Sequence, residues 1–208
     1  MKVSAMTLLR SFALAGVALA LAACSSTPVS LDYQPGLSQG PPGPRRVAAG
    51  RFADLRNENP YYLGTVKTPI GTPLENLMTN VPVAEVVRNA FAHGLSSRKM
   101  LVSHTSAPYL ITGEILELRC DQVVRPGAYA KIRVNVVKAD SGQVVFSRIY
   151  NGVREMGAYM PGSGSPVPTL RELMSRALQD VIDRALDDSA LRTHLRGSAP
   201  SGYGPDVL

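Results

Sequence analysis

The sequence is poor in the residues that most often do chemistry. It has no tryptophan and, among 208 residues, only three histidines and two cysteines. His93, His104 and His194 stand in separate parts of the chain, and none has a Cys, His or carboxylate partner at the spacing of a zinc site. We therefore expect no metal ion and no cofactor.

Catalytic motifs are also missing. The nearest approach to a Gly-x-Ser-x-Gly elbow is Gly162-Ser163-Gly164, which has the wrong spacing and lies between prolines. Glu114 and Glu117 are three apart on an expected strand, so we expect them on opposite faces. Asp180 and Asp183 share the solvated side of an expected helix. We predict that the chain is not an enzyme.

No apolar run is long enough to span a bilayer, which takes about 20 residues. The segment Phe12–Ala23 is apolar but short, and it follows Lys2 and Arg10. This pattern predicts a secretory signal peptide over residues 1–23. Its last residues and the next one, Leu21-Ala22-Ala23-Cys24, resemble a bacterial lipobox.

The lipobox resemblance implies diacylglycerol and an N-acyl lipid on Cys24. The alternative is an ordinary signal peptide with an incidental cysteine. Ser25 and Ser26 follow, and the lack of an aspartate there indicates the outer membrane, with the domain facing the periplasm. We expect a membrane partner through this anchor.

The net charge of the chain argues against nucleic acid as a partner. Cleavage before Cys24 would leave 20 basic and 16 acidic residues, a net charge of +4. This balance, together with export, argues against nucleic-acid binding. Cys120 would then have no partner in the chain, so we expect a buried thiol; an intermolecular disulfide is the alternative.

Composition divides the chain after the signal peptide. Residues 24–45 carry the lipidated cysteine and a Pro/Gly/Ser-rich tether, which we expect to hold the domain off the membrane. Residues 46–196 form one domain, and residues 197–208 a flexible tail.

Strand patterns fill much of the domain. We expect strands over 46–56, 61–67, 99–103 and 109–124, with a bulge or bend at Gly113. A hairpin follows over 128–155, with its turn at 140–142. Inward-facing apolar residues alternate with polar ones in its first strand: Ala130, Ile132, Val134 and Val136.

Two helices are predicted from apolar stripes. The first covers residues 82–97, with Asn80 as its cap. The second begins with a capping box of Thr169 and Glu172. Because each helix has one apolar stripe, both should pack on one face of the sheet. The expected fold is an α/β (α+β) two-layer sandwich with a mixed or antiparallel sheet, in the order β-β-α-β-β-β-β-α.

Several segments together resemble the YajG-type envelope lipoproteins. They include "FADLRNENPYYLG", "VPVAEVVRNAFAHGL", "YLITGEILEL" and the hairpin "AKIRVNVVKADSGQVVFSRIYNG". Wider relatives are auxiliary lipoproteins of ABC-type transport systems and TolB-like or curli-secretion domains. The resemblance implies an envelope lipoprotein and carries no catalytic residues.

Two expected loops are candidates for partner contact. Residues 57–79 carry Tyr61 and Tyr62, and residues 156–168 carry Tyr159 and Met160. The alternative is that these side chains cover the core. We expect a non-catalytic accessory module that binds an envelope protein, in a transport complex or as an activator of a cell-wall synthase. A lipid or glycan carrier and a hydrolase are further alternatives, and the oligomeric state stays open.

Overall fold

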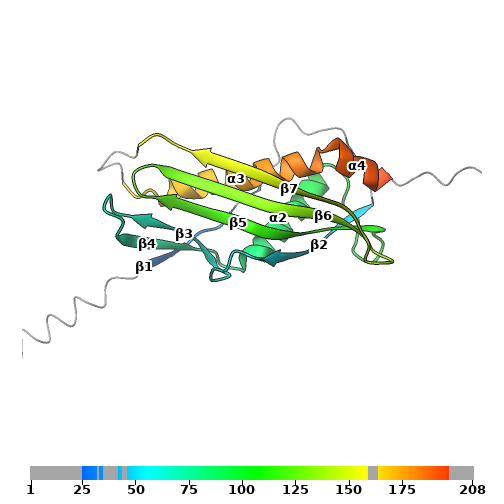
Figure 1. The fold of residues 1–208 in the computed structure, drawn as a ribbon, viewed down its shortest axis with the longest axis horizontal. Helices are drawn as coiled ribbons and strands as arrows, with labels where there is room; N and C mark the ends of the chain where they lie inside the picture. Colours follow the sequence, from blue (N-terminus) through cyan, green and yellow to red (C-terminus); the bar gives the residue numbers. More distant parts are fainter. Residues whose placement is uncertain (1–24, 32, 35–41, 44–45, 159–163, 197–208) are drawn as a thin grey trace, which may run out of the picture.

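The computed structural model describes residues 25–31, 33–34, 42–43, 46–158 and 164–196. They form one seven-stranded sheet with three helices packed against it (Figure 1). This confirms the predicted two-layer α/β sandwich. The elements, in chain order, are β1 (Ser25–Pro28), β2 (Val47–Asp54), β3 (Tyr62–Lys67), β4 (Pro73–Met78), α2 (Val83–Ser97), β5 (Tyr109–Gln122), β6 (Pro126–Lys138), β7 (Val144–Glu155), α3 (Val167–Leu186) and α4 (Ser189–Arg196).

The sheet is mixed and is organised around the long strand β5. Strands β5, β6 and β7 form an antiparallel meander. On its other side, β5 is flanked by two shorter parallel strands in succession, first β2 and then β3. Strand β4 pairs antiparallel with β3, and β1 pairs parallel with β4. The predicted hairpin and its Gly142 turn are present, and Gly142 has the positive φ of 68° that such a turn favours.

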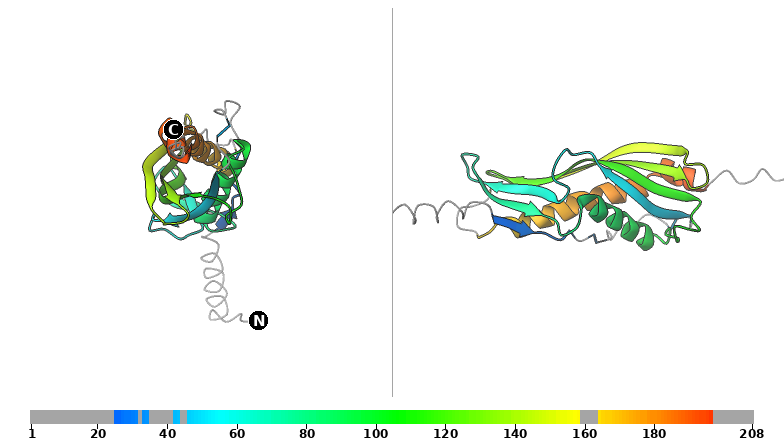
Figure 2. Two further views of the ribbon diagram at one scale, coloured as in Figure 1. Left: turned by 90° about the vertical axis from the view of Figure 1, so that its right-hand side faces the viewer. Right: turned by 90° about the horizontal axis from the view of Figure 1, so that it is seen from below.

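The helices cover one face of the sheet (Figure 2). Helix α2 packs on β2, and α3 crosses β5, β6 and β7 beside α2. The stripe predicted for α3 is buried in full, at Leu170, Leu173, Met174, Ala177, Leu178, Val181, Ile182, Ala185 and Leu186. In β6 the same is true of Ala130, Ile132, Val134 and Val136. These two surfaces belong to one continuous core, to which α2 and β5 also contribute.

Both predicted helix caps are wrong. Helix α2 follows Pro82 with no side-chain cap, and the Val83 N–H donates to the carbonyl of Pro60 instead of to Asn80. Helix α3 starts at Val167, so Thr169 lies inside the first turn and makes no capping bond. The hydroxyl of Ser165 accepts the Val167 N–H at 3.3 Å.

The irregularity in β5 lies three residues beyond Gly113. The pairing of β5 with β6 shifts between Ile115 and Glu117. This bulge reverses the alternation, so Glu114 and Glu117 both lie on the face away from the helices, contrary to the prediction of opposite faces. Gly113 serves a packing purpose, because a Cβ there would lie 2.8 Å from the ring of Phe52.

Cys120 is fully buried in β5, as predicted, beside the close approach of β3. A Cβ at Gly64 would lie 1.7 Å from the Cys120 carbonyl oxygen, so only glycine lets β3 reach this distance. Burial raises the pKa of the Cys120 thiol to about 12. A thiol in this state is a poor nucleophile, and its burial disfavours the intermolecular disulfide.

Four local expectations need correction. Residues 57–79 are largely a β3–β4 hairpin rather than a loop. Residues 99–103 contribute only one bridge, from Leu101 to Val47. Helix α4 was not predicted from the sequence. The start of the expected tether belongs to the sheet, because the backbone of Ser25–Pro28 pairs with β4.

Candidate functional site

The segment after Cys24 is attached to the domain at several points. The N–H of Val29 donates to the carbonyl of Met78 at 2.7 Å, which continues the β1–β4 pairing. The Val29 side chain is buried in the core, and Leu31 and Tyr33 pack against it. Residues 25–31 and 33 therefore lie along the domain rather than apart from it.

A buried charge cluster holds the end of this segment. Arg98, directly after α2, is the largest fully buried side chain among the described residues. It makes a two-pronged ion pair with Asp187, with Nε and Nη2 donating to the two carboxylate oxygens at 2.9 and 2.8 Å. Its Nη2 also donates to Asp183 at 2.9 Å. Tyr33 joins the cluster by donating its hydroxyl to Asp183 at 2.8 Å.

The cluster joins three parts of the chain at the C-terminal ends of α2 and α3. Arg192 of α4 also donates to Asp187, at 2.7 Å. Burial, opposed in part by the Arg98 hydrogen bond, raises the pKa of Tyr33 to about 12. The carboxylates outweigh burial for Arg98 and raise its pKa. The carboxylates therefore keep Arg98 ionised. We call this group the Arg98 cluster; it consists of Tyr33, Arg98, Asp183, Asp187 and Arg192.

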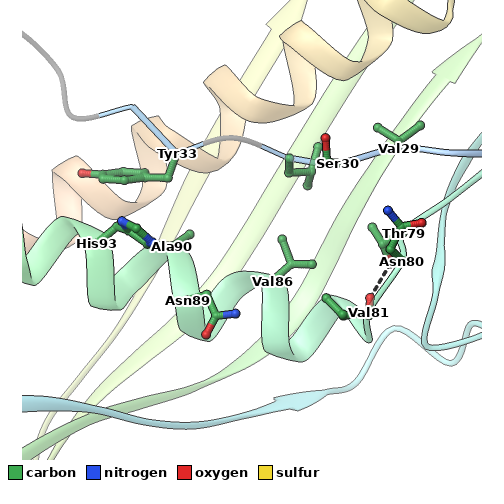
Figure 3. A pocket seen from close by; sticks show the side chains of 11 residues that line it. Val29, Ser30, Tyr33, Thr79, Asn80, Val81, Val86, Asn89, Ala90 and His93 are labelled. Carbon is green, nitrogen blue, oxygen red and sulfur yellow. Dashed lines mark hydrogen bonds between the residues drawn. The ribbon is translucent and has the colours of Figure 1, made fainter.

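A groove of about 310 Å³ lies between the N-terminal segment and α2 (Figure 3). Ser30 and Tyr33 lie on one side, and Val86, Asn89 and His93 of α2 on the other (Figure 3). The full lining is Val29, Ser30, Leu31, Tyr33, Thr79, Asn80, Val81, Val86, Asn89, Ala90 and His93.

The chemistry of this groove suits binding. Its lining has hydroxyl, amide and imidazole groups among aliphatic side chains, and the described lining residues include no carboxylate, lysine, arginine or cysteine. The part of the chain that the structure describes holds no group of three or more His, Cys, Asp or Glu able to bind a metal. Such a lining can offer hydrogen bonds and apolar contact to an extended segment.

A second groove, of about 260 Å³, lies where β2 ends and β3 begins. Arg56 fills the junction: it donates to both oxygens of Asp54 and to the carbonyls of Tyr62 and Leu118, each at 2.8 Å. These bonds satisfy backbone groups that the strand change would leave open. The groove is lined mainly by charged side chains from β3 and β5.

The predicted contact residues have different positions. Tyr61 is 41% exposed, as a contact residue would be. Tyr62 lines the second groove, and burial raises its pKa. Tyr159 and Met160 lie outside the described residues, as does Cys24.

All four candidate carboxylates have ion-pair partners. Glu114 pairs with Arg133, and Glu117 with Arg119 on the open face. Asp180 pairs with Arg154 at 2.7 Å. Asp183 was expected to be solvated, but it belongs to the Arg98 cluster because it accepts hydrogen bonds from Tyr33 and Arg98.

Sequence reasoning missed the Arg98 cluster. Its pairs join residues 85 and 89 positions apart, which no local pattern reveals. The one usable signal is an arginine directly after a helix that otherwise has no basic residue in its last turn.

These features define the chain at the level of fold, as a two-layer α/β sandwich. The sequence matches no family model and no curated protein. A protein of the DUF330 family from Xanthomonas campestris has a similar structure, with a TM-score of 0.59, 11% identity and coverage of 82% of this chain and 97% of that one. At this identity the likeness shows the fold alone.

Two other solved structures are similar to a smaller degree. A minor lipoprotein from Acinetobacter baumannii has a TM-score of 0.40 and 10% identity, covering 65% of this chain and 96% of that one. A candidate lipoprotein from Caulobacter crescentus has a TM-score of 0.43 and 14% identity, covering 55% and 84%. The YajG-type resemblance stays a prediction.

Proposed function

We propose that this chain is an outer-membrane lipoprotein, lipidated on Cys24 and facing the periplasm, that acts as a non-catalytic accessory module of a cell-envelope complex. The observation that carries the proposal is the position of β1. Its first residue, Ser25, follows Cys24 directly, and its backbone is paired into the sheet. A lipid on Cys24 would thus attach a folded edge of the domain to the membrane.

This arrangement supports a positional mechanism. Because no free chain separates Cys24 from β1, the anchor fixes where the domain lies as well as which membrane it joins. The Arg98 cluster fastens the following residues through Tyr33. No helix of the described residues is long and apolar enough to cross a membrane. In this proposal the acyl chains on Cys24 attach the protein to the membrane.

Partner contact is the second part of the proposal. Tyr61 and Val81 are both exposed and lie close together, because the Thr79 hydroxyl is within hydrogen-bond distance of both their carbonyls, at 3.1 and 2.7 Å. We assign this surface to an envelope protein partner. Tyr62, Tyr159 and Met160 stay candidate contact residues on the sequence argument alone. Exposed tyrosine beside an aliphatic side chain is typical of such contacts.

The anchor is tested by feeding cells a palmitate analogue and isolating the full-length protein. We expect label on the wild type, none on Cys24→Ser, and recovery of wild type in the outer-membrane fraction. An unlabelled wild-type protein would refute the proposed lipidation.

Partner contact is tested with a photo-crosslinking amino acid in living cells. Placed at Tyr61, it should give one discrete adduct that disappears in Val81→Asp. Placed at Asp140, in the β6–β7 turn, it should give no such adduct. Equal products from both sites would refute the assigned surface.

A further inference from the structure

The sheet has two ends with different surfaces. One end, which we call the anchor end, carries Ser25, the β3–β4 turn, the β5–β6 turn and the residue that follows β7. Strand pairing brings them together, because Ser25 lies opposite Glu75, and Val66 opposite Gln122. Figure 1 shows β1, the β3–β4 hairpin and the β5–β6 turn at the same end of the molecule.

Large apolar side chains are exposed at the tips of the anchor end. Ile70 is 89% exposed, the highest value among the large hydrophobic residues described, and Leu74 is 57% exposed in the same hairpin. Val123 and Val124 are exposed in the next turn. Met156 is exposed too, and its N–H donates to the Pro126 carbonyl at 3.0 Å, which places it beside that turn.

Hydrogen bonds fix the Ile70 turn in a shape that presents its side chain. The N–H of Gly71 donates to the Thr68 carbonyl at 2.8 Å, and the N–H of Thr68 donates to the Thr72 carbonyl at 2.8 Å. The N–H of Thr72 also donates to the Thr68 hydroxyl at 3.0 Å. Gly71 has a φ of 90°, which a residue with a side chain rarely adopts. Ile70 is thus held outward by a closed turn.

We propose that the anchor end is a membrane-contacting surface, where Ile70, Leu74, Val123 and Val124 enter the boundary between headgroups and acyl chains beside the lipid on Cys24. This inference rests on the proposed lipidation. It adds a direct contact between protein and bilayer, with the lipid bilayer as the single occupant of the surface.

The anchor determines this occupant. Consecutive α-carbons are about 3.8 Å apart, so Cys24 can lie no further than that from Ser25 at the anchor end. With no linker between them, acyl chains in the bilayer bring the adjoining turns to its surface. A protein partner at these turns would have to displace the membrane from its own anchor point.

The charges near the turns are compatible with a lipid surface. Lys67 closes the β3–β4 hairpin and Arg125 is exposed between Val124 and β6, so both can reach anionic headgroups. Three nearby acids are already engaged: Asp121 pairs with Arg119, Glu155 accepts a hydrogen bond from Tyr129 at 2.6 Å, and Glu75 accepts one from Thr27. Apolar contact therefore provides most of the expected interaction.

The test uses lipidated protein in vesicles of phosphatidylethanolamine and phosphatidylglycerol that contain spin-labelled acyl chains. A polarity-sensitive fluorophore is attached to Ile70→Cys or, as a control, to Val144→Cys at the opposite end. Cys120 is fully buried, so labelling is directed to the new thiol. We expect a blue-shifted, quenched signal at position 70 and an unshifted, unquenched one at position 144.

A second variant separates insertion from simple proximity. Val124→Asp should reduce quenching at position 70 several-fold, while Val144→Asp should leave it unchanged; circular dichroism checks that both are folded. If the anchored protein shows no quenching at position 70, the proposed contact between the anchor end and the bilayer is refuted, while the proposed lipidation stands. Lack of acyl label on Cys24 would overturn both.

Discussion

Arginine–carboxylate pairs lie on both faces of the sheet, in opposite environments. On the helix-covered face, Arg98 is 0% exposed and pairs with Asp183 and Asp187. On the open face, Arg119 is 46% exposed and pairs with Glu117 and Asp121. Each arginine has two carboxylate partners, but only Arg98 is fully buried, and only its partners are distant from it in sequence. We therefore expect the Arg98 cluster to determine stability and the position of the N-terminal segment.

The largest effect should come from Arg98→Ala. It leaves Asp183 and Asp187 without their main cation and opens a cavity, so the free energy of unfolding should fall by about 3–5 kcal/mol. Urea titration of the purified protein measures this. Arg119→Ala is the matched control on the open face and should cost less than about 1 kcal/mol. An equal loss of unfolding free energy in Arg98→Ala and Arg119→Ala would show that the buried arginine matters no more for stability than the exposed one.

Tyr33→Phe sharpens the comparison within the buried cluster. It deletes one hydroxyl, which donates to Asp183 and accepts from Arg98 at 3.2 Å. We expect a loss of about 1–2 kcal/mol in unfolding free energy, as for a hydrogen bond to a charged group. Exchange of the backbone amide hydrogens around Val29 should also become faster. An unchanged exchange rate there would show that Tyr33 does not hold the segment.

Alkaline pH should weaken the same contact. The folded state raises the pKa of Tyr33 from 10.0 to about 12, so it keeps the proton that the unfolded state releases. The stabilisation is complete below pH 10 and is lost as the pH rises toward 12. Cys120 and Tyr150 act in the same direction, so the test is the difference between wild type and Tyr33→Phe. Parallel pH curves for the two proteins would contradict this role.

The smallest effect should come from Arg133→Ala on the open face. Its side chain is partly exposed and pairs with Glu114 across β5 and β6. We expect a change of about 0.2–1 kcal/mol that shrinks in high salt, because solvent and ions screen such a pair. Thermal melts at low and high salt measure it.

Long periodic segments of the fold were predictable from sequence. Helix α3 and strand β6 each show an apolar stripe with one clear period, and burial follows that stripe residue by residue. The bulge after Ile115 was not predictable, because it lies where β5 passes from its pairing with β2 to its pairing with β3, and no local pattern marks that point. It reversed the expected relation between Glu114 and Glu117.

The candidate site was largely hidden from sequence. Strand β1 is four residues long and ends in proline, so nothing local distinguishes it from a tether. Its pairing depends on β4, about fifty residues away, which itself was taken as loop. Arg98 and Tyr33 likewise gain their roles only from distant partners. Tyr61 could be proposed because an exposed aromatic in a turn is a local signal.

The most direct test is hydrogen exchange of Ser25–Tyr33 in the lipidated protein bound to vesicles. Our account predicts slow exchange at Val29, whose N–H donates to Met78, and fast exchange at the exposed Asp140 turn. Fast exchange throughout Ser25–Tyr33 would show that this segment is a free tether. It would contradict the central claim that the membrane anchor is joined directly to the sheet.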